Sequence, residues 1–206
     1  MPHPPSVTIG LLGGVASGKS LVADLLAERG AVVLAADSVA HTVLVEPPVR
    51  EALIARWGEG ILTPSGEIDR RQVAQRVFGE SPQAIADRRF LEQLVHPRTR
   101  WRLEQLREHQ LQQGARVFVI DAPLLLEAGW DSACDWILFV ETPIERRRAY
   151  AAQRGWEEGE LERREQAQLA IELKRARADW VIDNSQDLSS LRLQVEEFCQ
   201  RAFPTA

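Results

Sequence analysis

The sequence predicts an α/β fold of three layers, in which helices cover both faces of a five-stranded parallel sheet. Two observations predict it. Short, nearly continuous apolar runs alternate with stretches of helical apolar spacing along the chain, a pattern typical of parallel strands that are buried on both faces. In addition, the glycine-rich segment "GGVASGKS" (residues 13–20) separates the first apolar run from the first helical stretch, where it predicts a phosphate-binding loop.

Five apolar runs are the strand candidates, and a helical pattern separates most of them from the next. In chain order they are "VTIGLL" (7–12), "AVVLAA" (31–36), "VFVI" (117–120), "WILFV" (136–140) and "WVI" (180–182). The chain closes with "DLSSLRLQVEEFCQRAF" (187–203), which predicts one helix with Asp187 or Ser189 as its N-cap. This order predicts a doubly wound sheet.

The glycine-rich segment has the spacing Gly13, four residues, Gly18, Lys19, Ser20, which is that of a P-loop. Glycines let successive backbone N–H groups face a phosphate, and the following helix adds the positive end of its dipole. A lysine can then reach the β- and γ-phosphates, and a serine hydroxyl can bind Mg²⁺. The strand–loop–helix context favours this P-loop NTPase type of fold over the alternative, an ordinary glycine turn.

Composition limits the class of protein. With 206 residues, of which 45% are hydrophobic, the chain predicts a single domain, 1–206, with room for an inserted module. The net charge of −5 argues against a dedicated nucleic-acid binder. Cys134 and Cys199 match no metal spacing and predict free thiols in a reducing compartment. The polar start "MPHPPS" and the lack of a long apolar run predict a soluble cytoplasmic protein without a membrane partner.

Residues 38–113 show helical patterns and no confident strand, so they predict a helical insert beside the sheet that could bind a second substrate. The clearest patterns are "DRRQVAQRVFGE" (69–80) and "DRRFLEQLVHPRTRWRLEQLREHQLQQG" (87–114). Within the second pattern, Pro97 is expected at the first position of a helix.

Two acidic residues follow strand candidates directly, Asp37 and Asp121. The carboxyl ends of parallel strands meet at one edge of the sheet, where the P-loop also opens. Each aspartate could instead cap a turn or helix. Because both stand at the edge that carries the P-loop, we expect them to converge on the phosphates.

Arginines are concentrated between residues 143 and 178, interleaved with glutamates. Three interpretations compete: a solvated helix with i,i+4 ion pairs, a nucleic-acid patch, and a lid that lays arginines over ATP. The acidic balance of the chain disfavours the second. We expect most of these arginines to be solvated and one or two to stabilise a transferring phosphoryl group.

At this point the chain resembles the dephospho-CoA kinase family along nearly its whole length. The matching blocks are "IGLLGGVASGKS" (9–20), "AADSVAH" (35–41), "GEIDRRQVAQRVF" (66–78), "LVHPRTR" (94–100), "DAPLLLEAGW" (121–130) and "RREQAQLAIELKRARADWVIDNS" (163–185). Many ATPases and GTPases share the P-loop, whereas "DAPLLLE" together with "ADWVIDNS" is far more specific.

The resemblance implies transfer of the ATP γ-phosphoryl group to the ribose 3′-hydroxyl of 3′-dephospho-CoA, which gives CoA. It implies an adenylate-kinase-like core, a helical CoA-binding region (38–113) and a helical lid (143–178). Asp37 matches the acidic residue proposed as base in this family. Arg154 and Arg164 match lid arginines, and Asn184 falls in the block near the ATP adenine.

Three departures from the family pattern stand out. Ala35 and Ala36 precede Asp37 where the family often has Asp-Ala-Asp. Ala16 replaces a frequent glycine, which is tolerable if its φ is negative. Tyr150 stands where an arginine is expected, and the neighbouring arginine that compensates for it is Arg146, Arg147 or Arg148.

The predicted function is therefore that of an ATP- and Mg²⁺-dependent small-molecule kinase. Asp37, Lys19 and Arg164 are the predicted catalytic residues, and Ser20 and Asp121 the predicted metal-binding residues, Asp121 through water. The predicted nucleotide-binding residues are Gly14, Val15, Ala16, Ser17, Gly18, Lys19, Ser20, Leu21, Arg154 and Asn184.

Two rival functions remain open. One is another P-loop kinase, acting on a nucleotide or small metabolite. The other is a nucleotide-gated binding protein, which is disfavoured because the chain has no Asn-Lys-x-Asp guanine motif.

Overall fold

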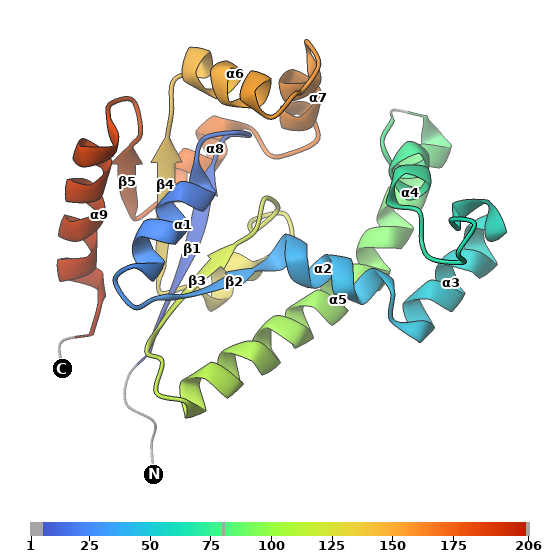
Figure 1. The fold of residues 1–206 in the computed structure, drawn as a ribbon, viewed down its shortest axis with the longest axis horizontal. Coiled ribbons are helices and arrows are strands. Elements are labelled where there is room, and N and C mark those ends of the chain that lie inside the picture. The colour runs from blue at the N-terminus through green and yellow to red at the C-terminus, as the bar shows by residue number, and fades with distance from the viewer. Residues whose placement is uncertain (1–5, 80, 205–206) are drawn as a thin grey trace. The chain divides into compact units, whose positions relative to one another are not determined.

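The computed structural model describes residues 6–79 and 81–204 (Figure 1). The prediction for the start of the chain falls mainly on residues 1–5, which lie outside the described residues. The chain forms two compact units. The first runs up to Ala35 and continues from Leu106, and the second is Ala36–Gln105.

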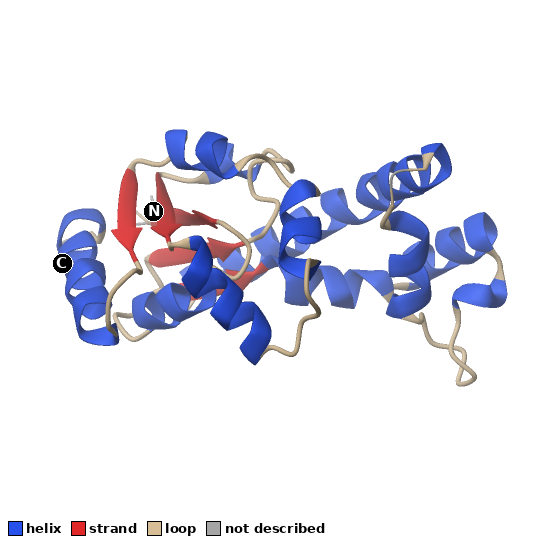
Figure 2. Ribbon diagram, turned by 90° about the horizontal axis from the view of Figure 1, so that it is seen from above, coloured by secondary structure: helices blue, strands red, loops and turns tan. Residues whose placement is uncertain are grey.

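The first unit is built on a parallel sheet, drawn in red in Figure 2, with the strand order β2-β3-β1-β4-β5. All five strand candidates form strands, with ends that differ by at most one residue from the expected ones. The strands are β1 (Val7–Gly13), β2 (Val32–Ala35), β3 (Val117–Asp121), β4 (Trp136–Glu141) and β5 (Trp180–Asp183). The predicted α/β fold with a five-stranded parallel sheet is confirmed.

Helices α1 (Lys19–Ala27) and α9 (Leu188–Ala202) pack against each other and against the sheet. Their apolar faces join the strands in a core in which Val22, Leu26 and Phe198 are fully buried. Removing these side chains from water supplies the main driving force for docking the helices. Of the two predicted caps of α9, the structure uses Asp187, whose carboxylate accepts from the backbone N–H of Ser190 at 2.8 Å.

The remaining helical elements of the first unit follow the later strands in the chain. They are η2 (Trp130–Ala133), α6 (Ile144–Gln153), α7 (Glu160–Gln166) and α8 (Ile171–Ala176). Among the described helices of the whole chain, none is both long and apolar enough to cross a bilayer. Both cysteines are free thiols, as predicted, and burial raises the pKa of Cys134 to about 12 and that of Cys199 to about 11.

The second unit is helical and has a core of its own. Its elements are α2 (Ala36–Leu44), α3 (Pro47–Trp57), η1 (Glu59–Ile61), α4 (Arg70–Val77) and the larger part of α5 (Pro82–Gln112). Among the described residues of this unit, the extended pairing is a single bridge between Leu62 and Ile68. Val43, Leu53 and Ile61 are fully buried in its core. The prediction of helices without a strand in this region is confirmed.

One expectation about this region is wrong. Pro97 does not begin a helix but lies inside α5. Proline removes one hydrogen bond of a helix and crowds the preceding turn, and the guanidinium of Arg98 donates to the carbonyl of Leu94 there, at 3.0 Å. Buried apolar residues on both sides of the proline, such as Val95 and Leu103, allow packing to outweigh this local preference.

Candidate active site

The predicted P-loop connects β1 to α1, and its glycines are required by close contacts. A Cβ atom on Gly13 would lie 2.5 Å from Ser17 Oγ and 2.9 Å from the carbonyl oxygen of Val140. At Gly18, φ is +87° and a Cβ atom would lie 2.7 Å from Asn184 Nδ2. Side chains at these two positions would therefore force the loop open, which is the physical reason for the glycine spacing.

The backbone conformation of Ala16 differs from the one expected from the sequence. Its φ is +58°, not negative, and left-handed backbone costs an L-residue about 1–2 kcal/mol. The Ala16 methyl group is buried in a cluster with Ala151 of α6 and Leu161 of α7. Burial of one methyl group stabilises the folded state by about 0.8 kcal/mol, so packing against these helices offsets much of the backbone strain at Ala16.

The carbonyl of Ser17 accepts hydrogen bonds from two buried side chains, which follow the carboxyl ends of the neighbouring strands β4 and β5. Thr142 Oγ1 donates to it at 2.7 Å, just after β4, and Asn184 Nδ2 donates to it at 2.9 Å, just after β5. These bonds fix the point at which the loop turns into α1. The predicted nucleotide-binding residue Asn184 thus contacts the P-loop itself.

A polar atom inside the loop lacks a partner among the described residues. Ser17 is buried, and its Oγ makes no hydrogen bond there. A buried hydroxyl without a partner is unfavourable, and a phosphate oxygen in the loop would supply an acceptor. The loop residues therefore fit a phosphate ligand.

Lys19, Ser20 and Asp121 lie together at the carboxyl edge of the sheet. Lys19 Nζ is 3.2 Å from the carbonyl oxygen of Gly14. Burial raises the pKa of the Asp121 carboxyl, while the charge of Lys19 and a hydrogen bond from Ser20 oppose that rise. A carboxylate so poorly hydrated, beside a hydroxyl, is a favourable site for a cation. The structure thus brings together the pair predicted to bind a metal.

Among the three arginines that could compensate for Tyr150, only Arg147 contacts the P-loop in the described structure. Its Nη1 donates to the carbonyl of Val15 at 3.4 Å. Arg146 instead donates to Tyr150 Oη at 2.7 Å, and Arg148 pairs with a glutamate of α7 on the surface.

The two predicted lid arginines lie against one aromatic ring. The guanidinium carbon of Arg164 is 4.1 Å from the centroid of the Trp156 ring, and that of Arg154 is 5.9 Å from it. Arg164 also forms an i,i+4 ion pair with Glu160 at 2.7 Å. The surface ion pair expected from a solvated helix is therefore present at Arg164.

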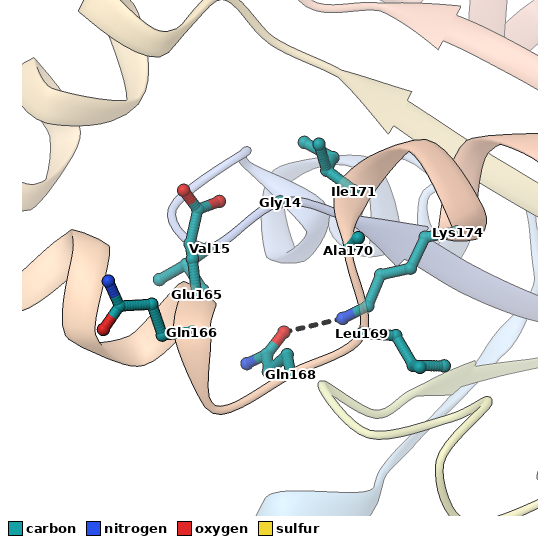
Figure 3. A pocket seen from close by; sticks show the side chains of 9 residues that line it. All are labelled: Gly14, Val15, Glu165, Gln166, Gln168, Leu169, Ala170, Ile171 and Lys174. Atoms are coloured by element: carbon teal, nitrogen blue, oxygen red, sulfur yellow. Dashed lines mark hydrogen bonds between the residues drawn. The ribbon is translucent and has the colours of Figure 1, made fainter.

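A cavity of about 320 Å³ lies between the P-loop and the segment that joins α7 to α8 (Figure 3). Its lining residues are Gly14, Val15, Glu165, Gln166, Gln168, Leu169, Ala170, Ile171 and Lys174. Lys174 is buried and donates to Gln168 Oε1 at 2.7 Å, and its ammonium lies 3.5 Å from the Glu127 carboxylate. Burial lowers the pKa of Lys174, and Glu127 opposes that shift.

The sequence prediction missed Lys174 and Glu127 as site residues. Glu127 closes the block "DAPLLLE", and Lys174 lies in the matching block of residues 163–185, ahead of "ADWVIDNS". An isolated lysine among arginines, and a glutamate closing an apolar run, were the available signals. Their pairing depends on a contact between distant segments.

The last two predicted site residues are Leu21 and Asp37. Leu21 lies in the first turn of α1 and is partly exposed. Asp37 is exposed in the first turn of α2, at the start of the second unit. It lies two residues after Ala35, which pairs in register with Asp121 at the end of the sheet. The role of Asp37 as a base stays a prediction.

Known dephospho-CoA kinases and a solved structure are similar to this chain over nearly its whole length. A dephospho-CoA kinase of Geobacter sulfurreducens is 38% identical over 200 residues, covering 95% of this chain and 98% of that protein. One of Symbiobacterium thermophilum is 38% identical over 191 residues, covering 91% and 78%. The crystal structure of TT1252 from Thermus thermophilus is 31% identical and superposes with a TM-score of 0.82, covering 98% of this chain and all of that one, 100%.

The family model for dephospho-CoA kinase matches residues 7–190, which include all of the second unit, most of the first and every predicted site residue. Together with relatives of nearly equal length, this match shows that the chain belongs to the dephospho-CoA kinase family.

Proposed function

We propose that this chain transfers the γ-phosphoryl group of ATP to the ribose 3′-hydroxyl of 3′-dephospho-CoA, giving CoA, with Mg²⁺ as cofactor. The observation that carries the proposal is the P-loop of a dephospho-CoA kinase family member, whose buried Ser17 hydroxyl has no hydrogen-bond partner among the described residues and whose Ser20 lies beside Asp121. The net charge of −5 fits small-molecule substrates better than nucleic acid, and we place the reaction in the cytoplasm.

The P-loop would bind the phosphates of ATP. Backbone N–H groups from Gly14 to Ser20 and the N-terminus of α1 face an anion in such a loop, and Lys19 adds a positive charge within reach of the β- and γ-phosphates. Since Ser17 is held at its carbonyl by Thr142 and Asn184, the loop is organised before the nucleotide arrives. Preorganised donors need no rearrangement during the reaction, which is the source of their catalytic effect.

Ser20 and Asp121 would hold Mg²⁺, Ser20 directly and Asp121 through water. When bound, the ion would neutralise charge on the β- and γ-phosphates. Ser20 lies close enough to Asp121 to oppose the rise that burial causes in the pKa of its carboxyl, so both side chains are available to one ion at this edge of the sheet.

In this proposal Asp37 acts on the acceptor hydroxyl, and Arg164 and Arg154 are the lid arginines. Asp37 would orient the 3′-hydroxyl and take its proton, because a carboxylate is the acceptor that this alcohol needs. We assign residues 38–113 to CoA binding and residues 143–178 to the lid. Arg164 would leave Glu160 and Trp156 to meet the transferring phosphoryl group, which carries negative charge.

An assay of ATP consumption with 3′-dephospho-CoA as the only acceptor tests this function. The expected product is CoA with its new phosphate on the 3′ oxygen, identified by mass spectrometry. Parallel reactions with AMP and with shikimate serve as controls. Turnover on one of these, with none on 3′-dephospho-CoA, would identify another P-loop kinase. Slow ATP hydrolysis without transfer to any acceptor would indicate a nucleotide-gated binding protein.

A further inference from the structure

Arg147 is a buried arginine beside the P-loop that the proposed mechanism does not use. It lies on α6 and is only 6% exposed, whereas the side chain of its neighbour Arg148 is 61% exposed. Arginine is almost never buried without partners. The surroundings of Arg147 therefore indicate what it does.

The guanidinium of Arg147 contacts both the P-loop and the lid region. Its Nε donates to the carbonyl of Thr142 at 3.2 Å, and its Nη1 donates to the carbonyl of Val15 at 3.4 Å. The same Nη1 forms an ion pair with Glu165 of α7. A Cβ atom on Gly14 would lie 2.7 Å from this nitrogen, so the guanidinium packs directly on the loop backbone.

Thr142 extends this connection to the other end of the loop. Its carbonyl accepts from Arg147, while its hydroxyl donates to the carbonyl of Ser17. Arg147 therefore holds the loop at Val15 directly and at Ser17 through one intermediate residue. A rigid guanidinium fork suits several acceptors in different directions, which a lysine ammonium on a flexible stem does not.

Glu165 gives the arrangement an electrostatic consequence. Its carboxylate lines the same cavity as Gly14 and Val15, and so lies beside the loop that would receive phosphates. Among the described residues, Arg147 forms the ion pair with Glu165, while the charge of Lys174, which pairs with Glu127, also acts on this carboxylate. Without Arg147, Glu165 would lose its ion-pair partner, and its negative charge, opposed only by a lysine that also pairs with Glu127, would repel the nucleotide.

We propose that Arg147 is a positioning residue that couples the lid helix α7 to the P-loop through Glu165 and keeps the Glu165 charge from opposing nucleotide binding. The inference rests on the proposed use of ATP by this loop. It places Arg147, and not Arg146 or Arg148, as the arginine that compensates for Tyr150. The guanidinium acts on the loop backbone and on Glu165, and not on the reacting phosphoryl group.

The test measures binding of Mg²⁺–ATP by calorimetry, without acceptor, together with KM for ATP and kcat. Arg147→Gln should weaken ATP binding about tenfold, with a smaller change in kcat, because one uncompensated charge near an anion acts mainly on binding. Arg147→Gln combined with Glu165→Gln should recover most of that affinity. Arg147→Lys should lie between wild type and Arg147→Gln, because it keeps the charge and loses the fork.

Arg148→Gln is the matched control, since it removes an arginine of the same helix whose ion pair with Glu162 is on the surface. It should leave ATP affinity unchanged.

Equal ATP affinity in wild type and folded Arg147→Gln would overturn the inference, as would a double variant no better than Arg147→Gln. If Arg147→Gln does not fold, the Glu165→Gln variant alone decides. Unchanged or tighter ATP binding by this variant supports the proposal that the Glu165 charge opposes nucleotide binding unless Arg147 compensates it, and weaker binding contradicts it. A wild type that binds no ATP would refute the proposed function instead.

Discussion

Asn184 Nδ2 donates to the carbonyl oxygen of Ser17 at 2.9 Å, although 167 residues separate the two in the sequence. The backbone N–H of Asn184 also donates to the carbonyl of Glu141 at 2.8 Å. One residue thus ties the end of β5 to the end of β4 and to the P-loop. This contact explains why a buried asparagine follows the last strand.

Asn184→Ala should lower the free energy of unfolding by about 1–2 kcal/mol, because Ser17 keeps only the Thr142 hydrogen bond and a small cavity opens. ATP binding should weaken in parallel, since the loop is then held at one point fewer. Urea unfolding and calorimetry measure the two effects. Asn184→Asp is the comparison variant, because it places a carboxylate against the carbonyl and should be more damaging. Wild-type stability with weakened ATP binding would instead favour a direct contact between Asn184 and the nucleotide.

Lys19→Ala should lower kcat by orders of magnitude while the protein remains folded. The reason is that the positive charge of Lys19 would stabilise the phosphates during transfer. In this structure its ammonium donates to the carbonyls of Gly13 and Gly14. Steady-state kinetics and circular dichroism test both parts. Lys19→Arg controls for charge alone, and we expect it to be impaired as well, since the planar fork does not fit this narrow loop. Near-normal turnover by folded Lys19→Ala would remove the P-loop from the mechanism.

Arg164→Ala should lower kcat with little change in stability, because an exposed ion pair such as that with Glu160 contributes little. Its neighbour Arg163 is also exposed, so Arg163→Ala is the control and should behave like wild type. Glu160→Gln should keep or raise kcat, since it releases Arg164 for the phosphoryl group. A loss of stability in Arg164→Ala with unchanged kinetics would show that the residue is only a solvated ion-pair partner.

The five strands of the sheet could be predicted from the sequence alone, because parallel strands that are buried on both faces appear in the sequence as short continuous apolar runs. The P-loop and the Ser20–Asp121 pair were predictable for a related reason: both depend on local spacing and on strand ends meeting at one edge. Pro97 was not, because buried residues on both sides of it outweigh the local preference to end a helix.

The wrong expectation about Ala16 and the open choice among three arginines both depend on contacts between distant segments. The positive φ of Ala16 depends on packing against Ala151 and Leu161, which no local rule contains. The choice of Arg147 among three arginines depended on which face of α6 is buried. A signal for it existed, since Arg147 stands four residues before the buried Ala151 and therefore on the same helix face.

Ala16→Gly should change the free energy of unfolding by less than about 1 kcal/mol, because relief of left-handed strain is balanced by the loss of a buried methyl group and by greater freedom of the unfolded chain. Ala16→Val should be strongly destabilising, since a β-branched residue is a steric outlier at this φ. Thermal and urea unfolding of the two variants measure this contrast. A large stabilisation by glycine would mean that the methyl group adds nothing to the contact with α6 and α7.

Asp37→Asn should lower kcat for 3′-dephospho-CoA while leaving ATP binding close to that of wild type. Asparagine keeps nearly the same shape and can still hydrogen-bond the 3′-hydroxyl, but it cannot take the proton. Positioned proton transfer typically contributes about 10²–10⁴-fold. We expect the lower part of that range or somewhat less, because a loose phosphoryl-transfer transition state needs the base late.

The matched control for Asp37→Asn is Glu51→Gln, which removes one exposed carboxylate from α3 of the same unit and should leave all parameters unchanged. Single-turnover kinetics with saturating ATP isolate the transfer step, and calorimetry with Mg²⁺–ATP reports nucleotide binding. Full kcat in Asp37→Asn would refute the assignment of Asp37 as the base. Loss of Mg²⁺ or ATP binding, with the acceptor absent, would move Asp37 from the acceptor to the metal, because only a contact on the nucleotide side can act before 3′-dephospho-CoA is bound.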